Sequence, residues 1–193
     1  MAEFPNRVRD MFVTQEINAA GIYLMRFYLN GKLTPVVVDD YLPVKEDGTP
    51  AFATSRDGEL WVSLLEKAWA KLHGSYALIE GGLPSFAASH LMGVPAEAYL
   101  HDDQVDDSDS FFEKLESADR RNFVIMAASN EEKATYGPAE GIVTGHAYSL
   151  ISVHRLNYKG SELKLIKLRN PWGCGEWTGA WSDSSESWTP ELK

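Results

Sequence analysis

GHAYSLISVHRLNYKGSELKLIKLRNPWG, residues 145–173, is the stretch from which the architecture of this chain can be inferred. Apolar and polar residues alternate on both sides of residues 158–160, which predicts two long strands joined by a tight turn. Antiparallel strands joined in this way bring their far ends together, so His146 and Asn170 should be close neighbours. The sequence therefore predicts a hairpin with an imidazole and a carboxamide side by side at its open end.

A carboxamide beside a histidine can fix the orientation of the ring. Asn170 can accept the Nδ1–H of His146, which sets the tautomer and leaves the other nitrogen free to act as base and then acid toward a thiol. Trp172 can cover this contact and keep water off it. The same pattern is also typical of a core histidine with its hydrogen bonds satisfied and of a turn asparagine before proline.

The single cysteine of the chain, Cys174, lies four residues after Asn170 and between two glycines. A nucleophilic thiolate needs a base within about 3 Å and a field that lowers its pKa. A predicted loop offers no such field, and Asn170 and Trp172 should stand between the thiol and the working edge of His146. We interpret Cys174 as a small loop residue.

The first half of the chain contains clear hairpin and helix signals. Residues 21–44 predict two strands around Asn30-Gly31, a dipeptide typical of a two-residue hairpin turn. Apolar residues recur about every four positions over residues 60–72, which predicts an amphipathic helix ended by Gly74. Residues 81–100 predict a connection punctuated by glycine and proline, with one short helix.

The second half begins with an acidic run over residues 102–109, which is the best candidate for a domain boundary. Ser110 and Glu113 have the spacing of a capping box and predict a helix to about Arg120. Residues 122–129 predict a buried strand. The window 102–113 has the length of an EF-hand loop, but Asp replaces the required glycine at its sixth position and Gln replaces an acidic ligand. A solvated linker followed by a capped helix explains it better.

Composition narrows the function classes. A chain of 193 residues with 44% hydrophobic and 24% charged residues is typical of a globular protein, and its net charge of −10 disfavours nucleic acid as a partner. One cysteine cannot form an internal disulfide, the N-terminus has no signal-peptide pattern, and no segment approaches the roughly 20 apolar residues of a membrane span. We therefore expect an intracellular, cytoplasmic protein.

The motifs GHAYSL, LRNPWG and EWTGAWSDSS, in this order, resemble the second core domain of the calpain family of calcium-dependent cysteine proteases. Upstream, GIYLMRFYLNG, VVVDDYLP and ELWVSLLEKAWAKLHGSY resemble the later part of the first core domain. The resemblance covers essentially the whole chain. It implies an α+β, papain-like fold in partial form, with residues 1–103 ending core domain 1 and residues 104–193 forming most of core domain 2.

The resemblance also implies roles for the residues at the open end of the hairpin. Calpains use a Cys–His–Asn triad, in which His146 would be the general base, Asn170 its orienting residue and Trp172 their shield. The family's nucleophile lies in a segment upstream of the first hairpin that this chain does not include, so we expect the chain alone to cleave no peptide. The alternative is a non-catalytic, calpain-like binding or regulatory module.

Calcium and protein partners follow from the same resemblance. Calpain core domains bind calcium outside any EF-hand, and Glu59 in the first domain and Glu176 and Asp183 in the second match ligand positions. Calcium requires about six to eight oxygen ligands, so each site would be incomplete in this chain. The implied partners are protein or peptide substrates, the missing N-terminal segment of the same protease core, and regulatory domains or a regulatory subunit.

Overall fold

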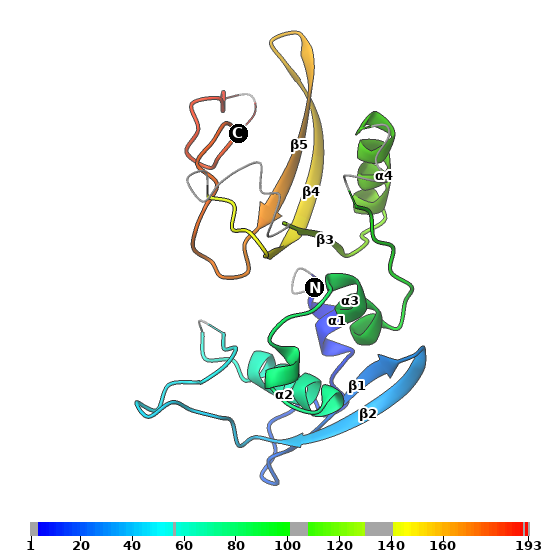
Figure 1. Ribbon diagram of the computed structural model, residues 1–193, viewed down its shortest axis with the longest axis vertical. Helices are drawn as coiled ribbons and strands as arrows, with labels where there is room; N and C mark the ends of the chain where they lie inside the picture. Colours follow the sequence, from blue (N-terminus) through cyan, green and yellow to red (C-terminus); the bar gives the residue numbers. More distant parts are fainter. Residues whose placement is uncertain (1–3, 56, 101–107, 130–140, 191, 193) are drawn as a thin grey trace. The chain divides into compact units, whose positions relative to one another are not determined.

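The computed structural model describes residues 4–55, 57–100, 108–129, 141–190 and 192. The chain divides into two compact units, Met1–Ala98 and Tyr99–Lys193 (Figure 1). The predicted boundary between residues 103 and 104 and most of the acidic run lie outside the described residues. Both units combine helices with an antiparallel sheet, so the fold is α+β, as the sequence predicts.

The first unit is built on the predicted hairpin, which follows a short helix α1 (Pro5–Arg9). Strands β1 (Ile22–Leu29) and β2 (Lys32–Asp39) pair antiparallel along their whole length. The two turn residues have φ values of 52° and 73°, the left-handed conformation that a two-residue turn of this type requires and that Asn and Gly tolerate. The Asn30-Gly31 signal is therefore confirmed.

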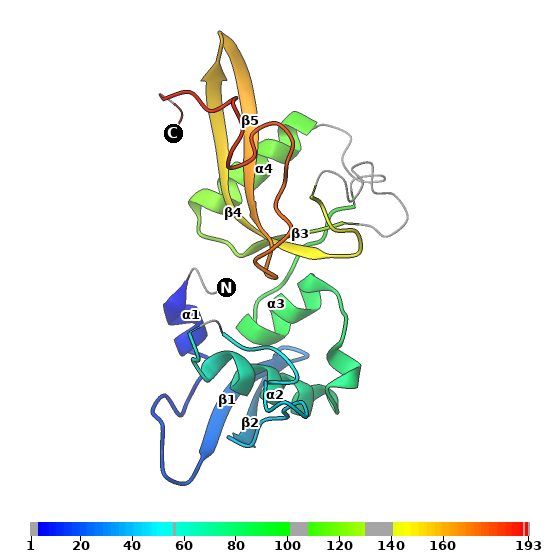
Figure 2. The same ribbon diagram turned by 90° about the vertical axis from the view of Figure 1, so that its left-hand side faces the viewer.

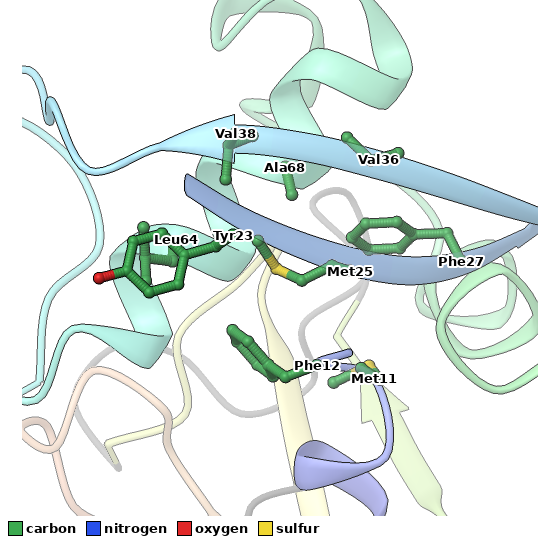
Figure 3. Packing of buried hydrophobic residues seen from close by; sticks show 9 residues of the cluster. All are labelled: Met11, Phe12, Tyr23, Met25, Phe27, Val36, Val38, Leu64 and Ala68. Carbon is green, nitrogen blue, oxygen red and sulfur yellow. The ribbon is translucent and has the colours of Figure 1, made fainter. Parts of the chain in front are cut away.

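Helix α2 (Trp61–His73) packs against this hairpin, as the spacing of apolar residues predicts. Alternate residues of the strands point to one face and are buried there with one face of the helix (Figure 3). The buried cluster consists of Met11, Phe12, Tyr23, Met25, Phe27, Val36, Val38, Leu64 and Ala68. A short 3-10 helix η1 (Ala77–Ile79), which the sequence did not predict, and helix α3 (Pro84–Met92) complete the unit.

Glycine ends both longer helices of this unit. Gly74 follows α2 with φ 110° and donates its N–H to the Ala70 carbonyl. Gly93 follows α3 with φ 68°, and its backbone abuts the ring of Tyr28 so closely that a Cβ would lie 2.6 Å from a ring carbon. Only glycine combines this conformation with this close approach.

In the residues of the second unit that the structure describes, a three-stranded antiparallel sheet is accompanied by one helix, α4 (Ser108–Arg120). Strands β3 (Ile125–Ala128), β4 (Ala147–Tyr158) and β5 (Ser161–Arg169) follow the order β3-β4-β5, and β4 and β5 turn at Lys159-Gly160 as predicted. Two predictions are wrong in detail. The helix begins at Ser108, which places Ser110 in its first turn rather than at the cap. The third strand is half-buried rather than buried, with Met126 and Ala128 exposed. It is four residues long because Asn122, at φ 55°, and Phe123 belong to the turn that ends α4.

Helix α4 lies beside strands β4 and β5 (Figure 2). Charged and polar side chains join the helix to the sheet. The Asp119 carboxylate accepts the backbone N–H of Val153 at 3.0 Å. The Arg155 guanidinium pairs with Glu116 on the helix at 2.9 Å and with Glu162 on β5 at 2.9 Å. Hydrogen bonds from Arg155 lower the pKa of both carboxyl groups, so each stays ionised to a lower pH than a free glutamate does.

Candidate active site

The side chains of His146 and Asn170 meet where β4 begins and β5 ends. The imidazole Nε2 lies 2.9 Å from the Asn170 Oδ1. The proximity follows from the antiparallel register, in which Ser149 pairs with Arg169. The expectation that Asn170 accepts the Nδ1–H is wrong. Asn170 directly follows the neighbouring strand, some distance from the backbone of His146. Nε2 is the ring nitrogen farther from that backbone, so it is the one that reaches Asn170.

Asn170 organises the loop that follows β5 as well as the imidazole. Its side chain is buried, with 8% of the residue exposed. Its Oδ1 also accepts the backbone N–H of Trp172 at 3.0 Å, and its Nδ2 donates to the carbonyl of Cys174 at 2.8 Å. These two bonds identify the amide orientation, because Oδ1 faces a donor and Nδ2 an acceptor. The oxygen facing His146 is therefore an acceptor, and Nε2 carries the proton.

Two aromatic rings surround the imidazole of His146. The indole of Trp172 lies 4.2 Å from it between ring centroids at 43°, and Tyr148 meets it edge-on at 4.9 Å and 83°. Tyr148 is buried, and its hydroxyl accepts the N–H of Val143 at 2.8 Å. Trp172 is 62% exposed, so it covers one face of the imidazole while its own outer face meets solvent.

The backbone of His146 is held by Ser129, which directly follows β3. The Ser129 N–H donates to the His146 carbonyl at 2.9 Å, and the Ser129 Oγ accepts the His146 N–H at 3.1 Å. The same hydroxyl lies 2.6 Å from the carbonyl of Val143. Ser129 thereby holds both the N–H and the carbonyl of His146.

Cys174 contributes its backbone to this arrangement. Its carbonyl accepts from Asn170, and the free cysteine is exposed in an irregular loop rather than at a helix N-terminus. The Asn170 amide bonds this carbonyl through Nδ2 and the imidazole of His146 through Oδ1. A thiol in this setting has none of the helix-terminus field that activates a nucleophile.

Sequence reasoning missed Ser129 and Tyr148. A signal existed for Tyr148, because residues two apart on a strand share a face and Tyr148 is two residues after His146. No pattern pointed to Ser129, which lies 17 positions before His146 in the chain and meets it only through the pairing of β3 with β4. Its contribution depends on tertiary structure.

The described carboxylates do not form a calcium site by themselves. Glu59 accepts the indole N–H of Trp61 at 3.0 Å in the first unit, while Glu176 and Asp183 are exposed in the second. Within the part of the chain that the structure describes, no three His, Cys, Asp or Glu side chains gather where they could hold a metal ion. The donor set falls short of the ligand number that calcium requires.

None of the helices in the described residues has the length and apolar character needed to cross a membrane.

Comparison with known proteins places the chain in a family. The family described as calpain family cysteine protease matches residues 1–193. A calpain-type cysteine protease named ADL1 from Oryza sativa subsp. japonica is 42% identical over 97% of this chain, and one named DEK1 from Arabidopsis thaliana is 41% identical over 97%. Human calpain-12 is 38% identical over 88% of the chain.

These relatives are much longer than the chain, which covers 9% of the two plant proteins and 23% of the human one. The family match itself extends over every residue of the chain. The mixture of helices with antiparallel sheets is that of a partial calpain protease core. The chain belongs to the calpain family of cysteine proteases.

Proposed function

We propose that the protein containing this chain is a calcium-dependent cysteine endopeptidase in which His146 is the general base and Asn170 its orienting residue. The observation that carries the proposal is the 2.9 Å contact between Nε2 and Oδ1 beside the indole of Trp172. Asn170 holds the proton on Nε2, so Nδ1 is the nitrogen left to exchange a proton with a thiol. The two compact units are proposed to be parts of the two protease core domains.

The chemistry assigned to His146 is proton transfer. Nδ1 takes the proton of a cysteine thiol, and the resulting thiolate attacks the carbonyl carbon of a peptide bond. His146 then returns that proton to the leaving amine as the C–N bond breaks, and it later removes a proton from the water that hydrolyses the acyl-enzyme. The thiol is proposed to come from a part of the protein outside these 193 residues. We assign no catalytic role to Cys174, which is exposed in a loop.

Calcium dependence is proposed with Glu59, Glu176 and Asp183 each supplying a single ligand. The remaining ligands would come from other parts of the protein, which agrees with the small share of the relatives' length that the chain covers. The proposed substrates are proteins, and further partners are the rest of the protease core and regulatory domains or a regulatory subunit. We also propose a cytoplasmic setting, since the one cysteine of this chain cannot form a disulfide within it.

Peptide hydrolysis by the full protein that contains this chain tests the proposal. We expect His146→Ala to lower turnover of a fluorogenic peptide by about 10²- to 10⁴-fold, the usual contribution of general acid–base catalysis. Cys174→Ser is the matched control and should retain turnover. A calcium chelator should abolish turnover, and added calcium should restore it.

Three outcomes would contradict the proposal. Full activity of the His146→Ala protein removes the histidine from catalysis. Loss of activity in the Cys174→Ser protein would make Cys174 the nucleophile. A wild-type protein without peptidase activity in calcium would support the non-catalytic module instead.

A further inference from the structure

The pairing of β3 with β4 does not end as a regular ladder does. The last paired residues are Ala128 and Ala147, and the next pair along would be Ser129 with His146. Residues of a hydrogen-bonded antiparallel pair normally exchange two backbone bonds. Here the Ser129 N–H donates to the His146 carbonyl, but the His146 N–H donates to the Ser129 hydroxyl at 3.1 Å. A side chain has replaced the last backbone acceptor of the sheet.

The same hydroxyl makes a second contact that the sheet does not require. A serine hydroxyl has one proton to donate and two lone pairs to accept with. Its oxygen lies 2.6 Å from the carbonyl of Val143 and 3.2 Å from the carbonyl of His146, so the shorter contact receives the proton. The hydroxyl therefore links the chain on both sides of Gly145, whose φ is 60°.

Gly145 makes this link important for the imidazole. Glycine is the residue with the greatest backbone freedom, and it directly precedes His146. A rotation of the backbone at Gly145 would move the Cα of His146, and with it the ring whose Nε2 must stay 2.9 Å from Asn170. The Ser129 hydroxyl opposes such a rotation because it holds Val143 and His146 at once.

We propose that Ser129 is a positioning residue for His146: its hydroxyl fixes the backbone from Val143 to His146 and thereby keeps the imidazole on Asn170. The catalytic meaning of this role rests on the proposed function, in which His146 is the base. The positioning itself does not depend on catalysis, so it can be measured on the 193-residue chain.

Nitrogen-15 NMR of the histidine rings measures the effect directly. In the wild-type chain, long-range proton–nitrogen spectra should show His146 protonated on Nε2, with slow exchange of that proton with water. In the Ser129→Ala chain the Nε2 proton should exchange roughly five- to a hundredfold faster, the change expected for the loss of the two hydrogen bonds that the hydroxyl makes to His146 and Val143. The nitrogen shifts should move toward a mixture of the two neutral tautomers, because the ring no longer stays on Asn170.

Two controls separate positioning from general stability. Ser129→Thr retains a hydroxyl and should restore the wild-type His146 signals. Ser152→Ala removes a hydroxyl from β4 that lies 2.7 Å from the Nε2 of His154, so it should change the His154 signals and leave those of His146 unchanged. If Ser129→Ala does not fold, Ser129→Val replaces it, since valine and threonine have the same shape and differ in the hydroxyl.

The proposal is overturned if the His146 tautomer and proton exchange are the same in wild type, Ser129→Ala and Ser129→Val. It is overturned as well if neither variant without the hydroxyl folds, because Ser129 would then support the whole unit rather than the imidazole. Both results leave the protease proposal intact, which fails separately if His146→Ala retains peptidase activity.

Discussion

Replacing Asn170 with alanine should lower the free energy of unfolding of the second unit, because it removes contacts at the open end of the β4–β5 hairpin. The substitution removes three hydrogen bonds, to His146 at 2.9 Å, Trp172 at 3.0 Å and Cys174 at 2.8 Å. At about 1 kcal/mol net for each bond, the upper bound on the loss of unfolding free energy is about 3 kcal/mol. Water can reach the exposed Trp172 and Cys174 and replace part of this, so we expect about 1.5–3 kcal/mol.

Hydrogen exchange followed by mass spectrometry can measure this loss within one unit. Peptides from β4 and β5 report the opening of the sheet, and a loss of 1.4 kcal/mol corresponds to about tenfold faster exchange. The Asn170→Ala chain should therefore exchange these amides roughly ten- to a hundredfold faster, while β1 and β2 peptides stay unchanged because they lie in the other unit.

Asn157→Ala is the matched control at the opposite end of the same hairpin. Asn157 is exposed and its side chain accepts a single hydrogen bond, from the N–H of Gly160 at 3.1 Å. That variant should lose no more than about 1 kcal/mol. If Asn170→Ala accelerates exchange no more than Asn157→Ala does, the three bonds of Asn170 do not stabilise the unit, and the reasoning is refuted.

Other perturbations test the first unit. Phe27→Ala removes a fully buried ring and should cost about 3–5 kcal/mol, measured by urea denaturation with exchange of the β1 and β2 amides as the local readout. Gly93→Ala forces a Cβ against the Tyr28 ring at positive φ and should cost about 1–3 kcal/mol by the same assay, whereas unchanged stability would refute the close approach. Burial, followed by the charge of His90, lowers the pKa of His73, so the unfolded chain binds protons first as pH falls. Stability should therefore decline below the unfolded pKa of about 6.5, and His73→Phe should flatten a plot of the thermal midpoint against pH.

Local sequence patterns predicted those turns and helices whose structure is determined by their own residues. The two hairpin turns carry residues that tolerate positive φ, and the face of α2 repeats apolar residues at helical spacing, so neither depends on distant parts of the chain. The start of α4 was placed too far along the chain because Ser110 and Glu113 have capping-box spacing although both lie inside the helix. Spacing alone does not show which turn of a helix is the first.

The arrangement around His146 was predictable only in part. Hairpin geometry was enough to place Asn170 beside the ring, because the register of two strands joined by a tight turn is determined locally. Which ring nitrogen contacts Asn170 depends on the side-chain torsions of His146, and the spacing of residues in the sequence does not determine these torsions. Ser129 reaches His146 only after β3 has paired with β4, so its role is a product of tertiary structure.

The turn at Lys159-Gly160 lies at the opposite end of β4 from His146. Twelve residues of strand separate them, which corresponds to about 40 Å of extended backbone. The tip of the hairpin is thus a suitable insertion point for a fluorophore or an affinity tag. A label carried there would sit many residue spacings from the imidazole, so the contact between His146 and Asn170 could be observed without altering either side chain.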